Sequence, residues 1–257
     1  MRVTLVQQPL LWHDPQANRE RFARLLAGLA GSTDLVVLPE TFTTGFSMEV
    51  ERLAEPAAGA TAEWMRQLAR RLDAAITGSI IAGEGGRYFN RLLWVEPDGT
   101  LRSYDKRHLF RMGREHEHFS PGGGPWCTEW RGLRVCPLVC YDLRFPVFSR
   151  RRPALDYDLL LYVANWPAAR AYAWRALLVA RAIENQSFVV GVNRIGADGA
   201  GIEHAGDSRV CDFLGQPLED LGSAPAVTTV ALEPQALRAW RERFPAHLDA
   251  DRFTLIP

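Results

Sequence analysis

The sequence contains few cysteines and no excess charge of either sign. Its 257 residues include four cysteines, Cys127, Cys136, Cys140 and Cys211. The first residues do not resemble a secretory signal, because their apolar part is short and soon interrupted by polar residues. We therefore expect reduced thiols in the cytoplasm and no disulfide framework. Lys plus Arg and Asp plus Glu both number 30, so no global field attracts nucleic acid or a membrane surface.

Long hydrophobic runs are also missing. No segment approaches the roughly 18 consecutive apolar residues that a membrane-spanning helix needs. The hydrophobic content of 47% and the length are sufficient for a sizeable core. No linker, repeat or composition break divides the chain, so we predict one α/β domain over residues 1–257.

Strand-like and helix-like segments alternate along the chain. The predicted strands are 2–8, 34–40, two or three over 74–85 and 87–109, then 133–140, 158–167 and 187–196, followed by a hairpin-like stretch over 208–220 and 226–232. The predicted helices are 18–30, 61–74, 171–186 and 233–245. Strands covered by helices are typical of α/β proteins. Periodicity alone leaves open whether the strands form one sheet or two.

Three predicted strands each end at a side chain that can take part in chemistry. Glu40 ends the run 34–40, Lys106 ends the run 101–106, and Cys140 ends the run 133–140. Because loops diverge where the strands of an α/β sheet end, side chains at such ends can converge on a crevice.

The three side chains together suit acyl transfer through a thioester. A thiol with a pKa of about 8.5 needs a nearby base or cation to become nucleophilic. Glu40 is a carboxylate that can accept the proton, and the Lys106 ammonium can stabilise an oxyanion. Taken singly, each residue also fits a structural role: Cys140 as a small buried residue, Glu40 as a solvated cap, and Lys106 as part of a basic surface turn.

Their order and surroundings favour the chemical interpretation. The segments LVVLPETFTTGF (35–46), YDKRHLF (104–110) and VCYDLRFP (139–146) resemble the three signature blocks of the nitrilase, or carbon–nitrogen hydrolase, superfamily. The segments DLLLYVANWP, AWRALLVARAIENQSFVVGVNRIG and GDSRVCDFLGQ resemble those that follow the nucleophile in this family. The resemblance therefore covers essentially the whole chain.

The resemblance implies a role for each residue of the three blocks. Cys140 would be the nucleophile, Glu40 the general base and Lys106 the oxyanion stabiliser. The backbone N–H of Tyr141 would be the second oxyanion donor.

The family also has a second glutamate between the Lys and the Cys, which orients the Lys and the substrate amide. Two residues, Glu115 and Glu117, are candidates here. The Ser-Pro-Gly that follows favours Glu115, but the choice stays open.

The implied fold is a four-layer α-β-β-α sandwich with two central sheets. Family members usually pair through helical faces, so at least a homodimer is expected. The implied chemistry needs no metal and no organic cofactor.

Within the superfamily, YDKRHLFRM, CYDLRFP and LYVANWP resemble the ω-amidase branch. Enzymes of that branch hydrolyse the terminal amide of short dicarboxylic monoamides such as 2-oxoglutaramate or succinamate. True nitrilases commonly have Trp-Glu where this chain has Tyr141 and Asp142, so nitrile hydrolysis is the weaker alternative, as is an aliphatic amidase.

A small anionic substrate needs a cation for its far carboxylate, and a bidentate guanidinium suits that group best. Our first candidate is Arg144, with Arg170 and Arg194 in reserve. Trp166 and Phe42 are candidate pocket walls, and Phe46 is a further candidate. Each of these side chains also fits ordinary packing or a surface role.

Two hypotheses from other classes remain. His116 and His118 would share a face if they lay on a strand, and could then ligate zinc in a metal-dependent hydrolase. A non-catalytic binding protein on the same fold is the other alternative, although Glu40, Lys106 and Cys140 are all present. We assign Cys136 to the core.

Overall fold

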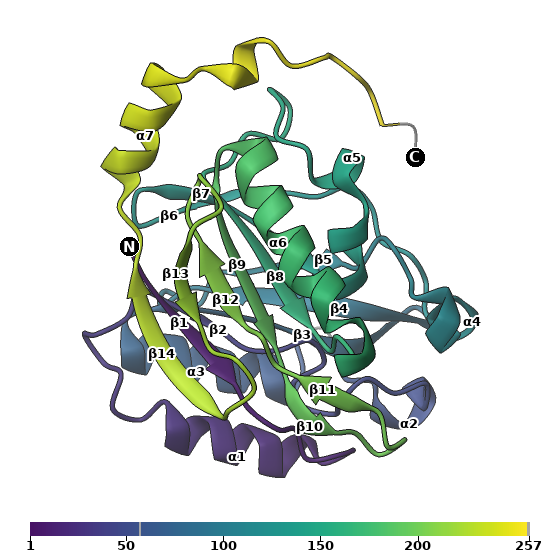
Figure 1. Cartoon of the computed structure of the whole chain (residues 1–257). Helices are drawn as coiled ribbons and strands as arrows, with labels where there is room; N and C mark the ends of the chain where they lie inside the picture. Colours follow the sequence, from purple (N-terminus) through teal and green to yellow (C-terminus); the bar gives the residue numbers. More distant parts are fainter. Residues whose placement is uncertain (57, 256–257) are drawn as a thin grey trace.

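The computed structural model describes residues 1–56 and 58–255. Two six-stranded sheets form its centre (Figure 1). The first has the order β14-β1-β2-β3-β4-β5, with strands Ala226–Ala231, Arg2–Gln7, Leu35–Val37, Ala75–Glu84, Arg87–Val95 and Leu101–Asp105. The second has the order β13-β12-β9-β8-β7-β6, with strands Pro217–Asp220, Arg209–Cys211, Phe188–Asn193, Leu159–Ala164, Leu133–Val139 and Thr128–Trp130.

Successive side chains of β2 point into two different hydrophobic clusters, one on each face of the first sheet. Leu35 and Val37 are buried in the cluster that includes the strands of the second sheet. Val36 belongs to a separate cluster with the helical residues Phe22 and Met65. Because both faces of the strand are covered, it is a continuous apolar run and does not alternate with polar residues.

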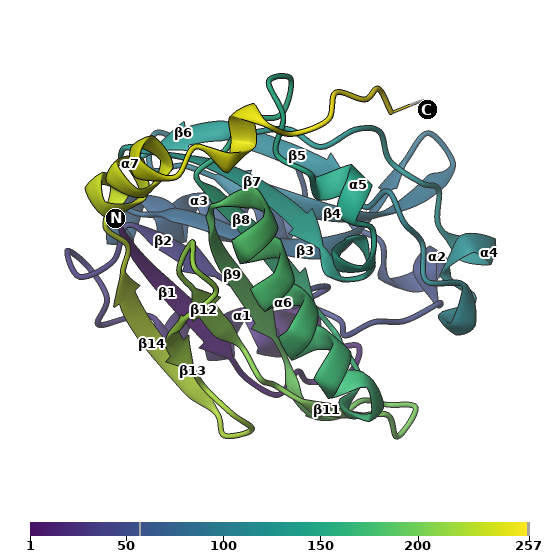
Figure 2. The ribbon, with the colours of Figure 1, turned by 45° about the horizontal axis from the view of Figure 1, so that its top comes forward.

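The helices complete the sandwich on both outer faces. Their bounds are α1 Pro15–Leu25, α2 Val50–Leu53, α3 Ala60–Leu72, α4 Glu115–His118, α5 Pro146–Ser149, α6 Ala171–Asn185 and α7 Pro234–Arg243. Helix α6 lies on the outer face of the second sheet, and α1 and α3 lie beyond the first (Figure 2). The prediction of a four-layer α-β-β-α sandwich is confirmed, and periodicity had left the two-sheet division open.

Several predicted segments differ from the structure in their bounds, among them the strand predicted over 34–40, which is Leu35–Val37. Two others have an evident local cause or consequence. The helix predicted over 18–30 begins at Pro15, because the Asp14 side chain accepts a hydrogen bond from the Ala17 N–H and Pro15 suits the first helical turn. The strand predicted over 187–196 ends at Asn193. The chain then forms β10 (Ile195–Ala197), which pairs with β11 (Glu203–Ala205) as a separate two-stranded sheet.

The strand directions bring Glu40 and Lys106 to the same end of the first sheet. Strands β2 and β3 are parallel, and two antiparallel steps through β4 give β5 the same direction. The segments that follow β2 and β5 therefore leave the first sheet at the same end, where both strands have their C-termini. In the described residues, no helix is long and apolar enough to cross a membrane.

Candidate active site

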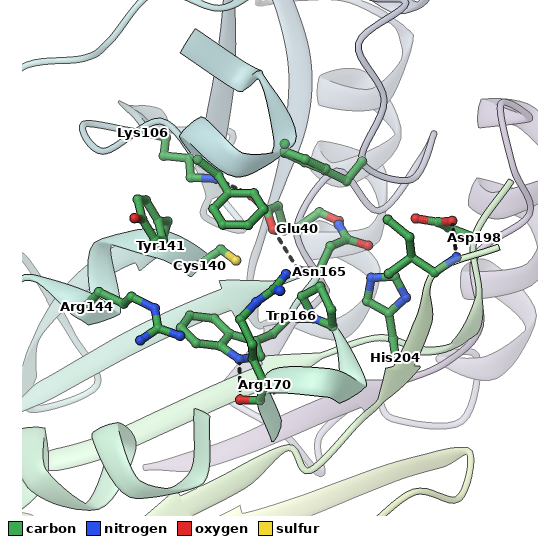
Figure 3. Close-up of a pocket in the computed structure, with 15 residues that line it drawn as sticks. Glu40, Lys106, Cys140, Tyr141, Arg144, Asn165, Trp166, Arg170, Asp198 and His204 are labelled. Atoms are coloured by element: carbon green, nitrogen blue, oxygen red, sulfur yellow. Dashed lines mark hydrogen bonds and ion pairs between the residues drawn. The ribbon is translucent and has the colours of Figure 1, made fainter. Parts of the chain in front are cut away.

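A pocket opens where these strands end (Figure 3). Glu40 follows β2 by three residues, Lys106 comes directly after β5, and Cys140 comes directly after β7. All three side chains line the pocket. The structure thus brings together the residues that the strand-end argument predicted to converge.

Cys140 has an unusual backbone conformation. Its φ of 43° lies in the left-handed region, which costs a non-glycine residue on the order of 1 kcal/mol or more. It begins a 3₁₀ turn, Cys140–Arg144, and Tyr141 also lines the pocket. Because the first N–H groups of a helical turn have no acceptor within the turn, the N–H of Tyr141 suits an oxyanion donor.

Glu40 is fully buried, and both carboxylate oxygens accept hydrogen bonds. Oε1 accepts from Lys106 Nζ at 2.8 Å and from Asn90 Nδ2 at 2.8 Å. Oε2 accepts from the backbone N–H of Asn165 at 2.7 Å. These donors come from both sheets, so the carboxylate is held from two sides.

Lys106 lies between two glutamates. Its Nζ is 2.8 Å from Glu40 Oε1 and 3.0 Å from each oxygen of Glu115. Burial alone would lower the pKa of Lys106, but the charges of Glu115 and Glu40 outweigh it and raise the pKa. The side chain is therefore a fixed ammonium aimed into the site.

Only one of the two candidate second glutamates belongs to this cluster. Glu115 is fully buried, and its Oε2 accepts from the Phe110 N–H at 2.6 Å. Burial and the charge of Glu40 raise the pKa of Glu115, although Lys106 opposes them. Glu117 is exposed and pairs with Arg114. The geometry therefore favours Glu115 for the predicted orienting role.

The Cys140 side chain is almost fully buried, with 8% of the residue exposed. Burial and the charge of Glu40 raise the pKa of the Cys140 thiol well above its usual range, and Lys106 only partly opposes this. The resting thiol is therefore protonated at neutral pH. A nucleophilic role requires a base to remove the proton during the reaction, and Glu40 lies beside it.

Two arginines line the same pocket. The Arg144 guanidinium lies over the Trp166 ring at 5.0 Å, and that of Arg170 lies over the Phe110 ring at 5.2 Å. Trp166 also lines the pocket, as predicted for a wall, and its indole N–H donates to the Arg170 carbonyl.

Two predicted substrate residues lie elsewhere. Phe42 is fully buried in the core between Phe22 and Trp64, because its side chain packs under the first sheet and not at the loop. Phe46 lines the pocket in its place. Arg194, the second reserve, is buried and donates to the carbonyls of nearby residues, and it does not line the pocket.

Two asparagines were missed by the sequence reasoning. Asn90, inside strand β4, donates to both Glu40 and Glu115. Asn165, after β8, donates from its backbone N–H to Glu40 Oε2 and from its side chain to the Glu40 carbonyl. An asparagine inside a buried strand is unusual, and that signal could have drawn attention to Asn90.

A third missed feature ties the Lys106 segment to the Cys140 turn. Asp142 is fully buried, and its Oδ2 accepts from the Tyr104 hydroxyl at 2.8 Å and from the Val139 N–H at 3.1 Å. Its Oδ1 accepts from the His108 N–H at 3.1 Å and lies 2.7 Å from His108 Nδ1. We name these three side chains, Asp142, Tyr104 and His108, the Asp142 clamp.

The β10–β11 hairpin supplies the remaining wall. Asp198, Ile202 and His204 line the pocket from this side, opposite Tyr141 and Arg144 (Figure 3). Burial and the nearby Arg194 charge lower the pKa of His204 to about 4, so this imidazole is neutral at pH 7. The sequence had indicated only a strand over 187–196 and no hairpin after it.

The histidine pair does not have the geometry that the zinc hypothesis required. His116 and His118 lie in the short helix α4 and not on a strand, so positions two apart point to different sides. Within residues 1–56 and 58–255, no group of three or more His, Cys, Asp or Glu side chains is arranged to hold a metal ion. Cys136 is fully buried in the core, as predicted.

Comparison with known proteins places the chain in a family. The family model for carbon-nitrogen hydrolase matches residues 2–242. The chain is 50% identical to "Omega-amidase YafV" of Escherichia coli, over 99% of this chain and 98% of that protein. It is 28% identical to "2-oxoglutaramate amidase" of Bacillus subtilis, over 96% of each. The crystal structure of XC1258 from Xanthomonas campestris, a CN-hydrolase superfamily protein, has 54% identity and a TM-score of 0.97, covering 99% of this chain and 98% of that one.

The chain therefore belongs to the carbon–nitrogen hydrolase family, the nitrilase superfamily that the three blocks indicated. It is an amide-hydrolysing enzyme of that family. The matches extend over nearly the full length of this chain and of each compared protein, as the sequence resemblance suggested.

Proposed function

We propose that this enzyme is an ω-amidase, which hydrolyses the terminal amide of small dicarboxylic monoamides of the 2-oxoglutaramate or succinamate type. Full-length identity of 50% to a protein named an omega-amidase supports this substrate class. The B. subtilis relative named 2-oxoglutaramate amidase supports it further.

The observation that carries the proposal is the presence of free cations in the pocket that holds Cys140. Arg144 and Arg170 both line it, and neither forms an ion pair with any acidic residue in the described part of the chain. A guanidinium in a pocket binds a carboxylate through two parallel hydrogen bonds. A neutral aliphatic amide or nitrile has no far carboxylate for these cations to bind.

Acylation begins with proton transfer from the Cys140 thiol to Glu40. The Sγ then bonds to the amide carbon, and the carbonyl π electrons move to oxygen as an oxyanion. Lys106 Nζ and the N–H of Tyr141 stabilise that charge. The C–N bond breaks as Glu40 returns the proton to nitrogen, which releases ammonia and leaves a thioester.

Deacylation uses the same groups in reverse order. Glu40 removes a proton from water as the water oxygen bonds to the thioester carbon. The C–S bond then breaks, the acid leaves, and the proton on Glu40 restores the Cys140 thiol. Glu115, which holds Lys106 at two oxygens, keeps the ammonium aimed at the oxyanion in both steps.

A screen of ammonia release tests the substrate assignment. The substrates are 2-oxoglutaramate, succinamate, glutaramate, glutamine, a neutral aliphatic amide and a nitrile. We expect the highest kcat/KM for amides that carry a far carboxylate, because Arg144 binds that group. The Cys140→Ala variant is the control and should release no ammonia from any of them.

A higher kcat/KM for the neutral amide or the nitrile would contradict the ω-amidase assignment. It would leave the roles of Cys140, Glu40 and Lys106 in place, since those act at the amide end. Residual turnover by Cys140→Ala would instead contradict the thioester mechanism.

Two further properties belong to the proposal. An outward stripe of α6 that includes Tyr172, Ala176 and Ile183 is exposed and apolar, which supports a homodimer formed through this helix. A cytoplasmic location is supported by the four cysteines, all of which are free thiols.

A further inference from the structure

We infer that Arg170 binds the 2-oxo oxygen of the substrate and so makes the enzyme select 2-oxo amides over their 2-deoxo and 2-amino analogues. This inference rests on the proposed ω-amidase function and extends it to the group next to the far carboxylate. Arg144 holds the carboxylate in this arrangement, and Arg170 is the specificity residue.

The contacts of Arg170 leave its guanidinium available to a ligand. Its Nη1 lies 3.8 Å from Met112 Sδ, and a thioether sulfur is a weak acceptor. The guanidinium also lies over the face of Phe110. No carboxylate in residues 1–56 and 58–255 pairs with it, whereas the Lys106 ammonium in the same pocket is paired with Glu40 and Glu115.

The positions of the two arginines suit different substrate atoms. In Figure 3 the Arg144 guanidinium lies beside the Trp166 indole, and the Arg170 guanidinium lies in front of the pocket between Cys140 and Asn165. A chain bonded to Cys140 through its amide carbon presents its carboxylate last and the 2-position one carbon earlier. Two separated cations can therefore bind two successive groups.

The number of hydrogen-bond acceptors on the substrate also supports binding of the 2-oxo oxygen by Arg170. One guanidinium fork satisfies the two oxygens of a carboxylate. A second guanidinium then needs a further acceptor, and the end of a 2-oxo acid has a third oxygen next to the carboxylate. Glutaramate has the same chain length but lacks this oxygen, so it would leave Arg170 without a partner.

The charge of Arg170 also acts against a 2-amino substrate. Glutamine places an ammonium group where 2-oxoglutaramate has its carbonyl oxygen, and two cations at this position repel each other. Among the described residues, Asp198 is the one aspartate that lines the pocket, and it lies on the far side with His204 (Figure 3). Its Oδ1 already accepts from the N–H groups of Ala200 and Ile202.

The experiment measures kcat/KM for 2-oxoglutaramate, glutaramate and glutamine with four proteins. These are the wild type, Arg170→Met, Arg144→Met and Arg111→Met. Methionine keeps most of the apolar stem and removes the charge. Arg111 is exposed on the neighbouring turn and does not line the pocket, so its variant is the matched control for loss of one surface guanidinium.

We expect Arg170→Met to lower kcat/KM for 2-oxoglutaramate by about tenfold to a hundredfold more than for glutaramate, the range for losing a hydrogen bond to a charged group. Arg144→Met should lower both by similar factors. The preference for 2-oxoglutaramate over glutamine should also fall in Arg170→Met. Each comparison is a ratio of two rates for one protein, so partial unfolding of a variant cancels, and Arg170→Lys provides a second variant.

Equal losses for 2-oxoglutaramate and glutaramate in Arg170→Met would overturn the inference, since Arg170 would then be a second carboxylate ligand. A wild type that does not distinguish these two substrates would overturn it as well and leave the ω-amidase proposal intact. A wild type that prefers a neutral amide would overturn both, and this is visible before any variant is made.

Discussion

Glu115 and Glu117 are two residues apart in sequence, and their surroundings have little in common. Glu115 is buried with both oxygens 3.0 Å from Lys106 Nζ, whereas Glu117 pairs with Arg114 at the surface. The carboxylate of Glu115 fixes the position of a buried ammonium, and that of Glu117 contributes little because water screens its ion pair. The same chemical group therefore has two different consequences.

We predict that Glu115→Gln lowers kcat by about a hundredfold, within the range for groups that act on the transition state, because Lys106 loses one of its two charged partners. The matched change Glu117→Gln should alter kcat by less than about twofold. Steady-state ammonia release measures both. A similar loss in the two variants would show that Glu115 does not orient Lys106.

A second prediction concerns the thiol itself. The negative charge of Glu40 raises the pKa of Cys140 in addition to burial, so replacing Glu40 by neutral glutamine should lower that pKa. Alkylation by iodoacetamide needs the thiolate, so its midpoint should shift to lower pH in Glu40→Gln while amide hydrolysis is lost.

The pH profile of alkylation, followed by mass spectrometry of the Cys140 peptide, checks this prediction. Cys140→Ala is the control for labelling of the other three thiols. A midpoint that stays the same or moves to higher pH in Glu40→Gln would mean that the Glu40 charge does not act on the thiol.

Among the secondary-structure elements, strand β5 and the 3₁₀ turn after β7 are joined by the Asp142 clamp. Tyr104 lies on β5 and His108 follows Lys106 by two residues, while Asp142 follows Cys140 by two. The clamp therefore fixes the distance between the segment with the ammonium and the segment with the nucleophile. None of its three side chains lines the pocket, so Asp142 is a positioning residue.

We predict that Asp142→Asn lowers kcat by at least about tenfold and the free energy of unfolding by about 2–3 kcal/mol, since an amide nitrogen would face buried donors. Asp34→Asn is the matched control, because Asp34 accepts from the backbone and side chain of Arg2 on another part of the first sheet. It should lower stability and leave kcat unchanged. Urea titration and ammonia release give the two quantities, and equal kcat values for both variants would argue against a positioning role.

The sequence predicts where the strands and longer helices lie, because burial on two faces produces continuous apolar runs such as 133–140, which contains β7 (Leu133–Val139). It also predicts Glu40, Lys106 and Cys140 as a group, since each directly follows such a run or nearly so. The layer arrangement followed from the family resemblance and not from periodicity.

Other parts of the site could not be predicted, because they depend on contacts between distant segments. Asn90 reads as one polar residue inside a strand, and its role is visible only once Glu40 and Glu115 lie on either side of it. Phe42 and Phe46 are both plausible walls in sequence, but only Phe46 lies at the pocket. The β10–β11 wall follows a strand that ends three residues earlier than the apolar pattern suggests.

For the whole molecule, helix α6 carries apolar side chains on both of its sides. Trp174 and Leu178 are buried against the second sheet, whereas Tyr172 is 79% exposed and Ile183 is 52% exposed on the outer side. A helix that is apolar all round is typically buried on both sides. Val147 on helix α5 is a further exposed apolar side chain, at 53%.

We predict that Ile183→Asp weakens self-association of the protein by about a hundredfold or more. A twofold interface brings the same patch of both subunits together, so one substitution places two carboxylates in it, and burying unpaired charge at an interface is costly. Leu25→Asp is the matched control, since Leu25 is a partly exposed apolar residue at the end of α1, on the opposite side of the sandwich (Figure 1). Sedimentation velocity over a range of concentrations should give dimers for the wild type and Leu25→Asp and monomers for Ile183→Asp. A monomeric wild type, or an unchanged dimer in Ile183→Asp, would exclude this face of α6 as the interface.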